Sequence, residues 1–212
     1  MTQPIPLHQI EDEGALLRAL ADAPPWAESA AKPRGNRGLG AAFRRWSPAE
    51  GAPALAMLDA VFEAALRREW FGRLGQDEQD AAAARVAAAL HLFALGPREP
   101  SGPVAQSFGS ACGRDAGKGP VVSNGRFART VNAPPDPALR LQAVGRAFRH
   151  VGAAGVRVAG SDAPNLLRFL FSAEPEPAVA RWAGDYFRTR PIVDAAAPGE
   201  AAADVPAPPP TA

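Results

Sequence analysis

Arginine side chains without acidic neighbours are the residues of this sequence best suited to chemistry. Residues 123–151 hold five arginines and a histidine but only one acid, Asp136, and residues 32–46 hold five bases and no acid. The planar guanidinium of arginine fits a phosphate group and keeps its charge when it is partly buried. Both basic clusters therefore predict contact with an anion, and several arginines in series favour a polyanion such as a nucleic-acid backbone.

The positive charge is concentrated in the middle of the chain. The formal net charge of the 212 residues is only +1 at pH 7. Residues 1–28 carry five acids and one base, and residues 191–212 carry three acids and no base, which leaves a net charge of +8 on residues 29–190. Of the bases, 21 are Arg and 2 are Lys, and a GC-rich genome explains this preference as readily as function does. The placement of the arginines has to distinguish the two explanations.

Helical periodicity places two pairs of arginines on solvent-facing surfaces. On a helix over residues 137–151, Arg146 and Arg149 point away from the apolar face. Arg126 and Arg129 are three residues apart and share a face of the preceding helix. Neither pair has a carboxylate four residues further on to neutralise it. Together with the first cluster, the candidate nucleic-acid contacts are Arg37, Arg44, Arg45, Arg126, Arg129, Arg146 and Arg149.

An ordinary solvated helix face would mix acids with bases. The segment "ARWAGDYFRTR" is the example in this chain, because Arg181 and Asp185 are four residues apart. We expect these two to form an ion pair and interpret Arg181 as structural. The unpaired arginines of the basic clusters therefore favour contact with a nucleic-acid backbone over a solvated surface.

Catalytic and metal-binding chemistry has little support in the sequence. The histidines His8, His91 and His150 lie far apart, and none has a second metal ligand three or four residues away. The single cysteine, Cys112, allows no intramolecular disulfide and is interpreted as a buried side chain. The segment "GRDAGKGP" lacks the pattern of a phosphate-binding loop. We therefore expect no catalytic residue, no metal and no cofactor.

We expect an all-α fold, because apolar residues recur every three or four positions and an alternation of β-branched residues is nearly absent. The helices of this fold would position the arginines. The predicted helices cover residues 11–22, 39–46, 53–74, 77–95, 103–112, 123–132, 137–151, 164–171 and 177–188. The buried face predicted for the third helix consists of Leu55, Leu58, Phe62, Leu66 and Trp70. The buried face predicted for the last helix consists of Val179, Trp182, Ala183, Tyr186 and Phe187.

The helices are predicted to form two small bundles, over residues 1–112 and 121–190, with a Gly/Pro loop between them. The Pro/Ala-rich C-terminal tail, residues 191–212, has little to bury and is predicted to be disordered. No stretch approaches the roughly 18 apolar residues of a membrane span, and the N-terminus has no signal-peptide pattern. We expect a cytoplasmic protein that does not enter a membrane.

Five short segments follow one another along the chain in an order typical of one family. They are "AAFRRWSPAEG" (41–51), "AALHLFALG" (88–96), "SFGSACGR" (107–114), "SNGRFARTVNA" (123–133) and "RWAGDYF" (181–187). By their order and spacing they resemble the small subunit of the type I-E CRISPR surveillance complex Cascade, the CasB family. The resemblance covers roughly residues 11–190.

This resemblance implies a non-catalytic subunit built from two helical bundles. Members of the family dimerise within Cascade, and their basic surfaces contact crRNA and target DNA and stabilise the displaced non-target strand of the R-loop in antiviral defence. The partners implied are thus crRNA, target DNA, other Cascade subunits and a second copy of the chain. By motif, the family's basic positions fall on Arg44, Arg45, Arg126, Arg129, Arg146 and Arg149. Ser110 departs from the family, which often has a basic residue there.

Two other classes of function fit parts of the pattern. A regulator that binds double-stranded DNA would need a helix-turn-helix with a polar recognition helix, and no two predicted helices have that short spacing. A structural helical protein could use the same arginines against acidic protein surfaces, because an arginine face serves a carboxylate as well as a phosphate. The sequence alone leaves this last alternative open.

Overall fold

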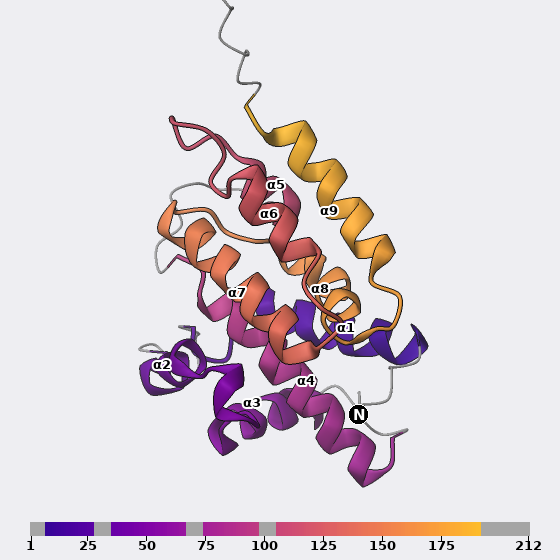
Figure 1. Cartoon of the computed structure of the whole chain (residues 1–212). Helices are drawn as coiled ribbons and strands as arrows, with labels where there is room; N and C mark the ends of the chain where they lie inside the picture. Colours follow the sequence, from indigo (N-terminus) through magenta and orange to yellow (C-terminus); the bar gives the residue numbers. More distant parts are fainter. Residues whose placement is uncertain (1–6, 28–34, 67–73, 98–104, 192–212) are drawn as a thin grey trace, which may run out of the picture.

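The computed structural model of the chain describes residues 7–27, 35–66, 74–97 and 105–191 (Figure 1). These residues form helices and no β-strand, which confirms the all-α expectation for the described part of the chain. The helices are α1 (Leu7–Asp22), α2 (Arg37–Arg45), α3 (Leu55–Leu66), α4 (Gln76–Ala94), α5 (Phe108–Gly113), α6 (Asn124–Val131), α7 (Pro137–Ala153), α8 (Ala163–Phe171) and α9 (Glu176–Thr189). No helix of the described ranges is long and apolar enough to cross a membrane.

Side-chain caps mark the start of α7 and α2, two of the helices that carry the basic residues. At the start of α7 the Asp136 carboxylate accepts a hydrogen bond from the Leu139 backbone N–H at 2.9 Å, and a proline occupies the first turn. At the start of α2 the Asn36 side-chain oxygen accepts from the Leu39 backbone N–H at 2.9 Å. The single acid of the stretch 123–151 therefore caps a helix and neutralises no arginine.

One hydrophobic cluster joins helices from both ends of the chain. In it, α4 packs against α1, α2, α3, α7 and α8, while α1 packs against α8 and α5 against α9. A buried ion pair also connects α1 with α4, where Arg85 Nε donates to Glu13 Oε2 at 3.0 Å. Figure 1 shows α6 lying between α7 and α9. The division into two bundles at residues 113–120 stays a prediction.

The buried face of α3 differs from the one predicted from its spacing. Met57, Val61 and Ala65 are fully buried, whereas Leu55 and Leu66 are each 73% exposed. Apolar residues surround most of this helix, so its pattern does not define one face. Helix α3 packs against α4 and α2, and its buried row ends in the small residue Ala65. The helix predicted here continues to residue 74. Residues 67–73 of that prediction, including Trp70, lie outside the described residues.

Other predicted elements were found with shifted ends. Helix α1 begins at Leu7 instead of residue 11, and α5 begins at Phe108 instead of residue 103. On α9, Trp182 and Tyr186 are buried as expected, but Phe187 is 57% exposed, so its predicted burial was wrong. In the predicted loop 113–120, Gly113 still belongs to α5, and residues 114–120 contain no helix. The C-terminal tail lies outside the described residues from residue 192 onward.

Candidate nucleic-acid interface

A groove between α6 and α7 brings together three of the predicted arginines. It has a volume of about 750 Å³, and Arg126 and Arg129 of α6 line it together with Arg146 and His150 of α7. We call it the basic groove. Helix α6 packs against α7, and its buried Phe127 ring stacks on Tyr186 of α9 with centroids 4.1 Å apart.

The three arginines of the basic groove are exposed, and none of them forms an ion pair with another described residue. The ion pairs of the described residues involve Arg18, Arg85 and Arg188 instead. The Arg126 Nη1 atom on α6 lies 3.4 Å from Nε2 of His150 on α7, so side chains from the two helices meet at this point of the groove. An anion in the groove would therefore meet charged donors from both helices without displacing a carboxylate.

The floor of the basic groove is apolar. We use this term for the apolar residues of the lining, which are Val122, Ala128, Ala133, Pro134, Leu139, Ala143 and Ala147. Thr130 and Asn132 are the uncharged polar residues of the lining. Leu139 is 45% exposed, which makes it one of the few large apolar side chains on the surface of the described residues. The groove thus combines a charged rim with an uncovered hydrophobic base.

The first basic cluster lies on α2. Arg37 is in the first turn of this helix, and Arg44 and Arg45 are in the last turn, where the helix dipole favours positive charge. Phe43 anchors α2 in the core, so that Arg37 and Arg45 are exposed and Arg44 is half-buried. The two remaining bases of this cluster, at positions 32 and 34, lie outside the described residues.

Arg149 lies outside the basic groove and is close enough to α4 to act on His91. The pKa of His91 is lowered chiefly by burial and further by the positive charge of Arg149, while its hydrogen bond to the Phe43 carbonyl opposes this shift. His91 Nδ1 donates that bond and so joins α4 to α2. The Arg149 charge therefore acts at the place where α4 contacts the helix of the first cluster.

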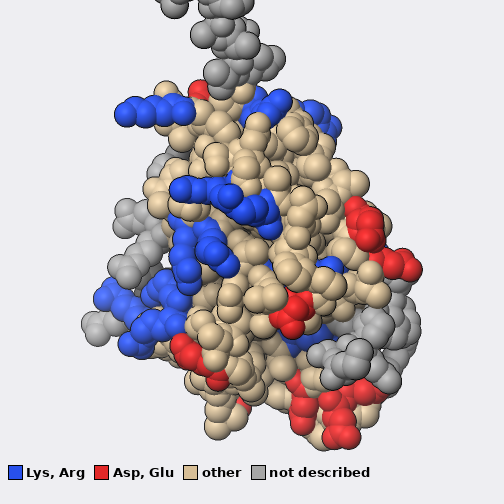
Figure 2. All heavy atoms as spheres, viewed as in Figure 1, with Lys and Arg blue, Asp and Glu red and all other residues tan. Residues whose placement is uncertain are grey.

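The basic side chains gather on one side of the molecule. Figure 2 shows Lys and Arg side chains over α6, α7 and α2, whereas Asp and Glu side chains lie mainly along the lower and right edges of the same view. We call the seven candidate arginines of α2, α6 and α7 the basic face. Three of them line the groove, three lie on α2, and Arg149 lies on α7 outside the groove.

One arginine of the stretch 123–151 has a structural role. Arg140 is only 6% exposed, and its Nη1 atom donates to the backbone carbonyls of Phe169 at 2.8 Å and Ser172 at 3.2 Å. These carbonyls belong to the C-terminal end of α8, which has no further helical turn to satisfy them. The stretch therefore exposes four arginines rather than five.

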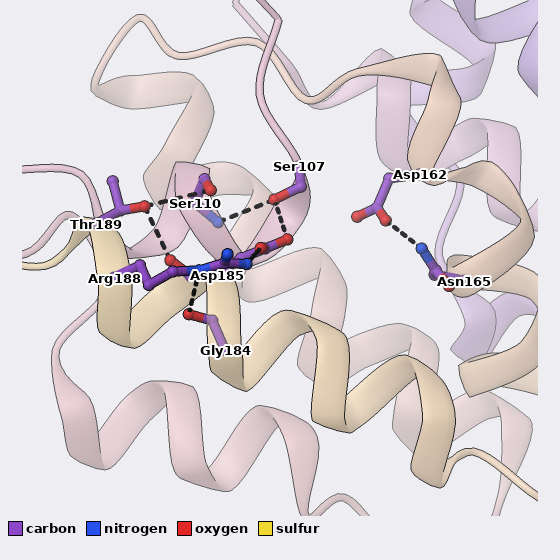
Figure 3. Close-up of polar contacts among 8 residues, drawn as sticks. All are labelled: Ser107, Ser110, Asp162, Asn165, Gly184, Asp185, Arg188 and Thr189. Atoms are coloured by element: carbon purple, nitrogen blue, oxygen red, sulfur yellow. Dashed lines mark hydrogen bonds and ion pairs between the residues drawn. The ribbon is translucent and has the colours of Figure 1, made fainter.

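The ion pair expected between Arg181 and Asp185 does not form. Asp185 instead pairs with Arg188 and accepts a hydrogen bond from Ser107 Oγ at 2.7 Å (Figure 3). Arg181 is exposed, and its charge acts on Asp162. Because Ser107 caps α5, the Asp185 carboxylate is oriented toward that helix and away from Arg181.

A second cluster of polar side chains, with two serines and a threonine as possible nucleophiles, lies where α5 contacts α9. Besides Ser107 and Asp185, Thr189 Oγ1 donates to the Asp185 backbone carbonyl at 2.8 Å and lies 3.2 Å from Ser110 Oγ, whose hydroxyl can donate to it (Figure 3). The histidine side chains that the structure describes, His91 and His150, belong to α4 and α7. Neither lies beside Ser107, where a general base would be needed to activate its hydroxyl. These bonds connect α5 to α9 and do not activate a nucleophile.

A buried carboxylate that the sequence reasoning missed joins α5, α8 and α9. Asp162 is 1% exposed and accepts hydrogen bonds from the Phe108 backbone N–H at 2.8 Å, Trp182 Nε1 at 2.9 Å and Asn165 Nδ2 at 2.7 Å. Burial raises the pKa of Asp162, and these three bonds oppose the shift. Burial also raises the pKa of the Cys112 thiol far above its usual range, so this buried side chain is not poised as a nucleophile.

No cluster of three potential metal ligands occurs among the residues that the structure describes. The groups with shifted pKa values lie in the core, and the groove that opens to solvent is lined by arginines. The geometry therefore favours binding of an anion over catalysis.

The family model of CRISPR-associated protein Cse2 matches residues 39–187 of the chain. This match spans well over half of the sequence, from α2 to the last turn of α9. The chain belongs to the Cse2 family. The family is that of the Cascade small subunit, so the resemblance found in the five sequence segments is confirmed. Cse2 proteins are structural subunits of Cascade. Searches of curated proteins and of solved structures found no match.

Two residues of the groove escaped the sequence reasoning. His150 belongs to the basic stretch 123–151 but is not among the predicted contacts, although it lies four residues after Arg146 and hence on the same helix face. Leu139 gave no signal, because its position in the first turn of α7 is compatible with either a core or a surface side chain. Its exposure depends on where the chain between α6 and α7 runs.

Proposed function

We propose that the chain is the small subunit of a type I-E Cascade complex and that its basic face contacts the backbone of crRNA and target DNA. In this role it stabilises the displaced non-target strand of the R-loop and catalyses no reaction. The observation that carries the proposal is the basic groove, where three exposed arginines meet without an ion pair to any described residue. Membership of the Cse2 family supports the same role.

Backbone contact is the recognition mode that this set of residues fits. Arginine binds phosphate oxygens through its planar fork, and phosphate contacts position a protein without reading sequence. Each phosphate that an arginine neutralises releases condensed counterions, so affinity falls as salt rises. We therefore expect binding that tolerates any sequence and weakens steeply with salt.

The remaining partners follow from the family. We propose that two copies of the chain associate within the complex and that they contact other Cascade subunits. Sedimentation of the assembled complex, with the chain labelled, measures the copy number. Two copies per complex are expected, and a single copy would contradict this part of the proposal.

Fluorescence anisotropy with labelled strands of unrelated sequence tests the backbone contacts. The logarithm of the binding constant is measured against the logarithm of the salt concentration for the full chain and for the Arg126→Ala, Arg129→Ala and Arg146→Ala variants. Each substitution should reduce the salt slope by about the contribution of one phosphate contact. The loss of affinity should be similar for strands of every sequence.

Arg18→Ala is the matched control, because Arg18 on α1 is equally exposed but already paired with Asp22. It removes the same charge and should leave the slope unchanged. Groove variants that bind as tightly as Arg18→Ala would contradict the proposal. A strong preference for one duplex sequence, insensitive to salt, would instead favour the double-stranded-DNA regulator.

A further inference from the structure

Phosphate binding accounts for the rim of the basic groove but not for its floor. The seven apolar side chains of the floor include Leu139, which is 45% exposed. A phosphodiester laid against them would lose hydration without gaining a partner, because apolar surface offers no hydrogen bond. The occupant of the groove must therefore present apolar surface to the floor and negative charge to the rim.

We propose that the basic groove takes an unpaired nucleobase of a single-stranded nucleic acid, while Arg126, Arg129 and Arg146 hold the phosphates beside it. This inference rests on the proposed function and adds a site for a base to its backbone contacts. A base has two flat faces of low polarity, and its own strand supplies a phosphate on either side. Charge complementarity and the apolar floor thus select the same ligand.

A duplex does not fit this description. Its bases are paired and stacked inside the helix, so its outer surface offers sugar and phosphate to a groove between two α-helices. In a single strand the bases can be turned out and packed against protein side chains. The volume of about 750 Å³ also lies within the range of roughly 300–1,000 Å³ of ordinary small-molecule sites, which accommodates a nucleoside.

The polar groups inside the groove indicate that any base is accepted. The Thr130 hydroxyl already donates to the Arg126 backbone carbonyl at 2.9 Å and is thereby engaged in α6. The apolar side chains of the floor carry no donor or acceptor. Asn132 also lines the groove, and its exposed side-chain amide, which both donates and accepts, can bond to the edge of any base. Contact with a base is therefore expected chiefly through its face, which every base possesses.

The proposal is tested by comparing three ligands of equal length: a single strand, the same strand with abasic sites throughout, and the duplex. The abasic strand keeps every phosphate but has no bases. The full-length chain should bind the normal strand about tenfold more tightly than either of the others, the ratio expected for burying a base-sized apolar contact. DNA and RNA versions of the strand should behave alike.

Two substitutions should remove this preference without changing charge. Leu139→Gln makes the floor polar, and Ala143→Gln fills the groove with a polar side chain. Both variants should bind the normal strand as weakly as the abasic one, while their affinity for the abasic strand stays that of the unmodified chain. Leu55→Gln on α3 is the matched control, because Leu55 is 73% exposed and does not line the groove.

The outcomes separate the inference from the proposed function. Equal affinity of the unmodified chain for normal and abasic strands, with a steep salt slope, would overturn the base site and leave the backbone contacts intact. No binding of any strand would overturn both. A strand with 2-aminopurine gives a readout that needs no variant, because the fluorescence of this base changes when it leaves its stacked neighbours, and an unchanged signal on binding would also overturn the base site.

Discussion

Gly109 of α5 lies directly against the backbone of Trp182 on α9. A Cβ atom at Gly109 would come within 2.2 Å of the Trp182 carbonyl oxygen, and one at Gly113 within 2.5 Å of the Tyr186 carbonyl oxygen. The two glycines are four residues apart and share one helix face, so α5 approaches α9 along its whole length. This contact places the buried Trp182 and Tyr186 rings in the core.

Replacing Gly109 with alanine should therefore separate α5 from α9. The added methyl group would meet backbone atoms that cannot rotate away, and such overpacking costs about 1–3 kcal/mol or more in the free energy of unfolding. Urea denaturation measures the loss. Gly125→Ala on α6 is the control, since nothing lies within 4 Å of its Cβ position, and it should be neutral or stabilising. Equal stability of the two variants would contradict the contact.

Asp162 should tolerate asparagine far better than alanine. Asp162→Ala leaves three buried donors without an acceptor, and each such donor costs about 1–3 kcal/mol. Asp162→Asn keeps one oxygen for Phe108 and Trp182, and a flip of the Asn165 amide can supply an acceptor to the new NH₂ group. The expected loss is several kcal/mol for alanine and about 1 kcal/mol for asparagine. Equally damaging substitutions in urea denaturation would contradict this role.

His91 should make the fold sensitive to acid. Its pKa lies below the usual 6.5 in the folded state, so the unfolded chain binds the proton more readily. The stability that His91 contributes is therefore present above pH 6.5 and is lost as the pH falls below that value through the folded pKa, by at most about 1.4 kcal/mol per pH unit.

The His91→Gln variant isolates this effect. Glutamine keeps a donor for the Phe43 carbonyl but does not titrate, so the variant should lose less stability than the unmodified chain between pH 7 and pH 5. The raised pKa values of Glu13 and Asp162 act in the opposite direction but are common to both proteins. Thermal melts across this range provide the comparison, and parallel curves would rule out the role of His91.

Two arginines of one helix should respond differently to the same substitution. Arg140→Ala removes the donor to the carbonyls of Phe169 and Ser172 and should lower the free energy of unfolding by about 2–4 kcal/mol. Arg146→Ala removes an exposed side chain and should change it by no more than about 0.5 kcal/mol, while weakening nucleic-acid binding. Urea denaturation and anisotropy on both variants measure this difference. Two variants alike in both measurements would contradict the assigned roles.

Helical periodicity predicted most of the fold because most helices have one apolar face. Leu141, Val144 and Phe148 of α7 are buried as expected, and Arg146 and Arg149 are exposed. The pattern failed on α3, which is apolar on several sides, so that only packing against α4 selects the buried row. It also could not predict Arg140 or Asp162, whose burial depends on polar partners far away in the sequence.

The candidate interface was predictable in its residues but not in its shape. Unpaired charge along the sequence identified the arginines of α2, α6 and α7. The basic groove exists because the chain between α6 and α7 turns back and lets the two helices pack, which leaves Leu139 uncovered. A surface formed by two elements has no periodic signature in either one, so neither the groove nor its apolar floor could be found from sequence.

The lifetime of the R-loop in the assembled complex tests the central claim most directly. A complex carrying the Arg126→Ala, Arg129→Ala and Arg146→Ala substitutions together should release its target about tenfold faster or more at physiological salt, because three phosphate contacts are lost. The complex should assemble normally, and its small subunit should keep its melting temperature. An R-loop as long-lived as that of the Arg18→Ala complex would show that the basic groove does not hold nucleic acid.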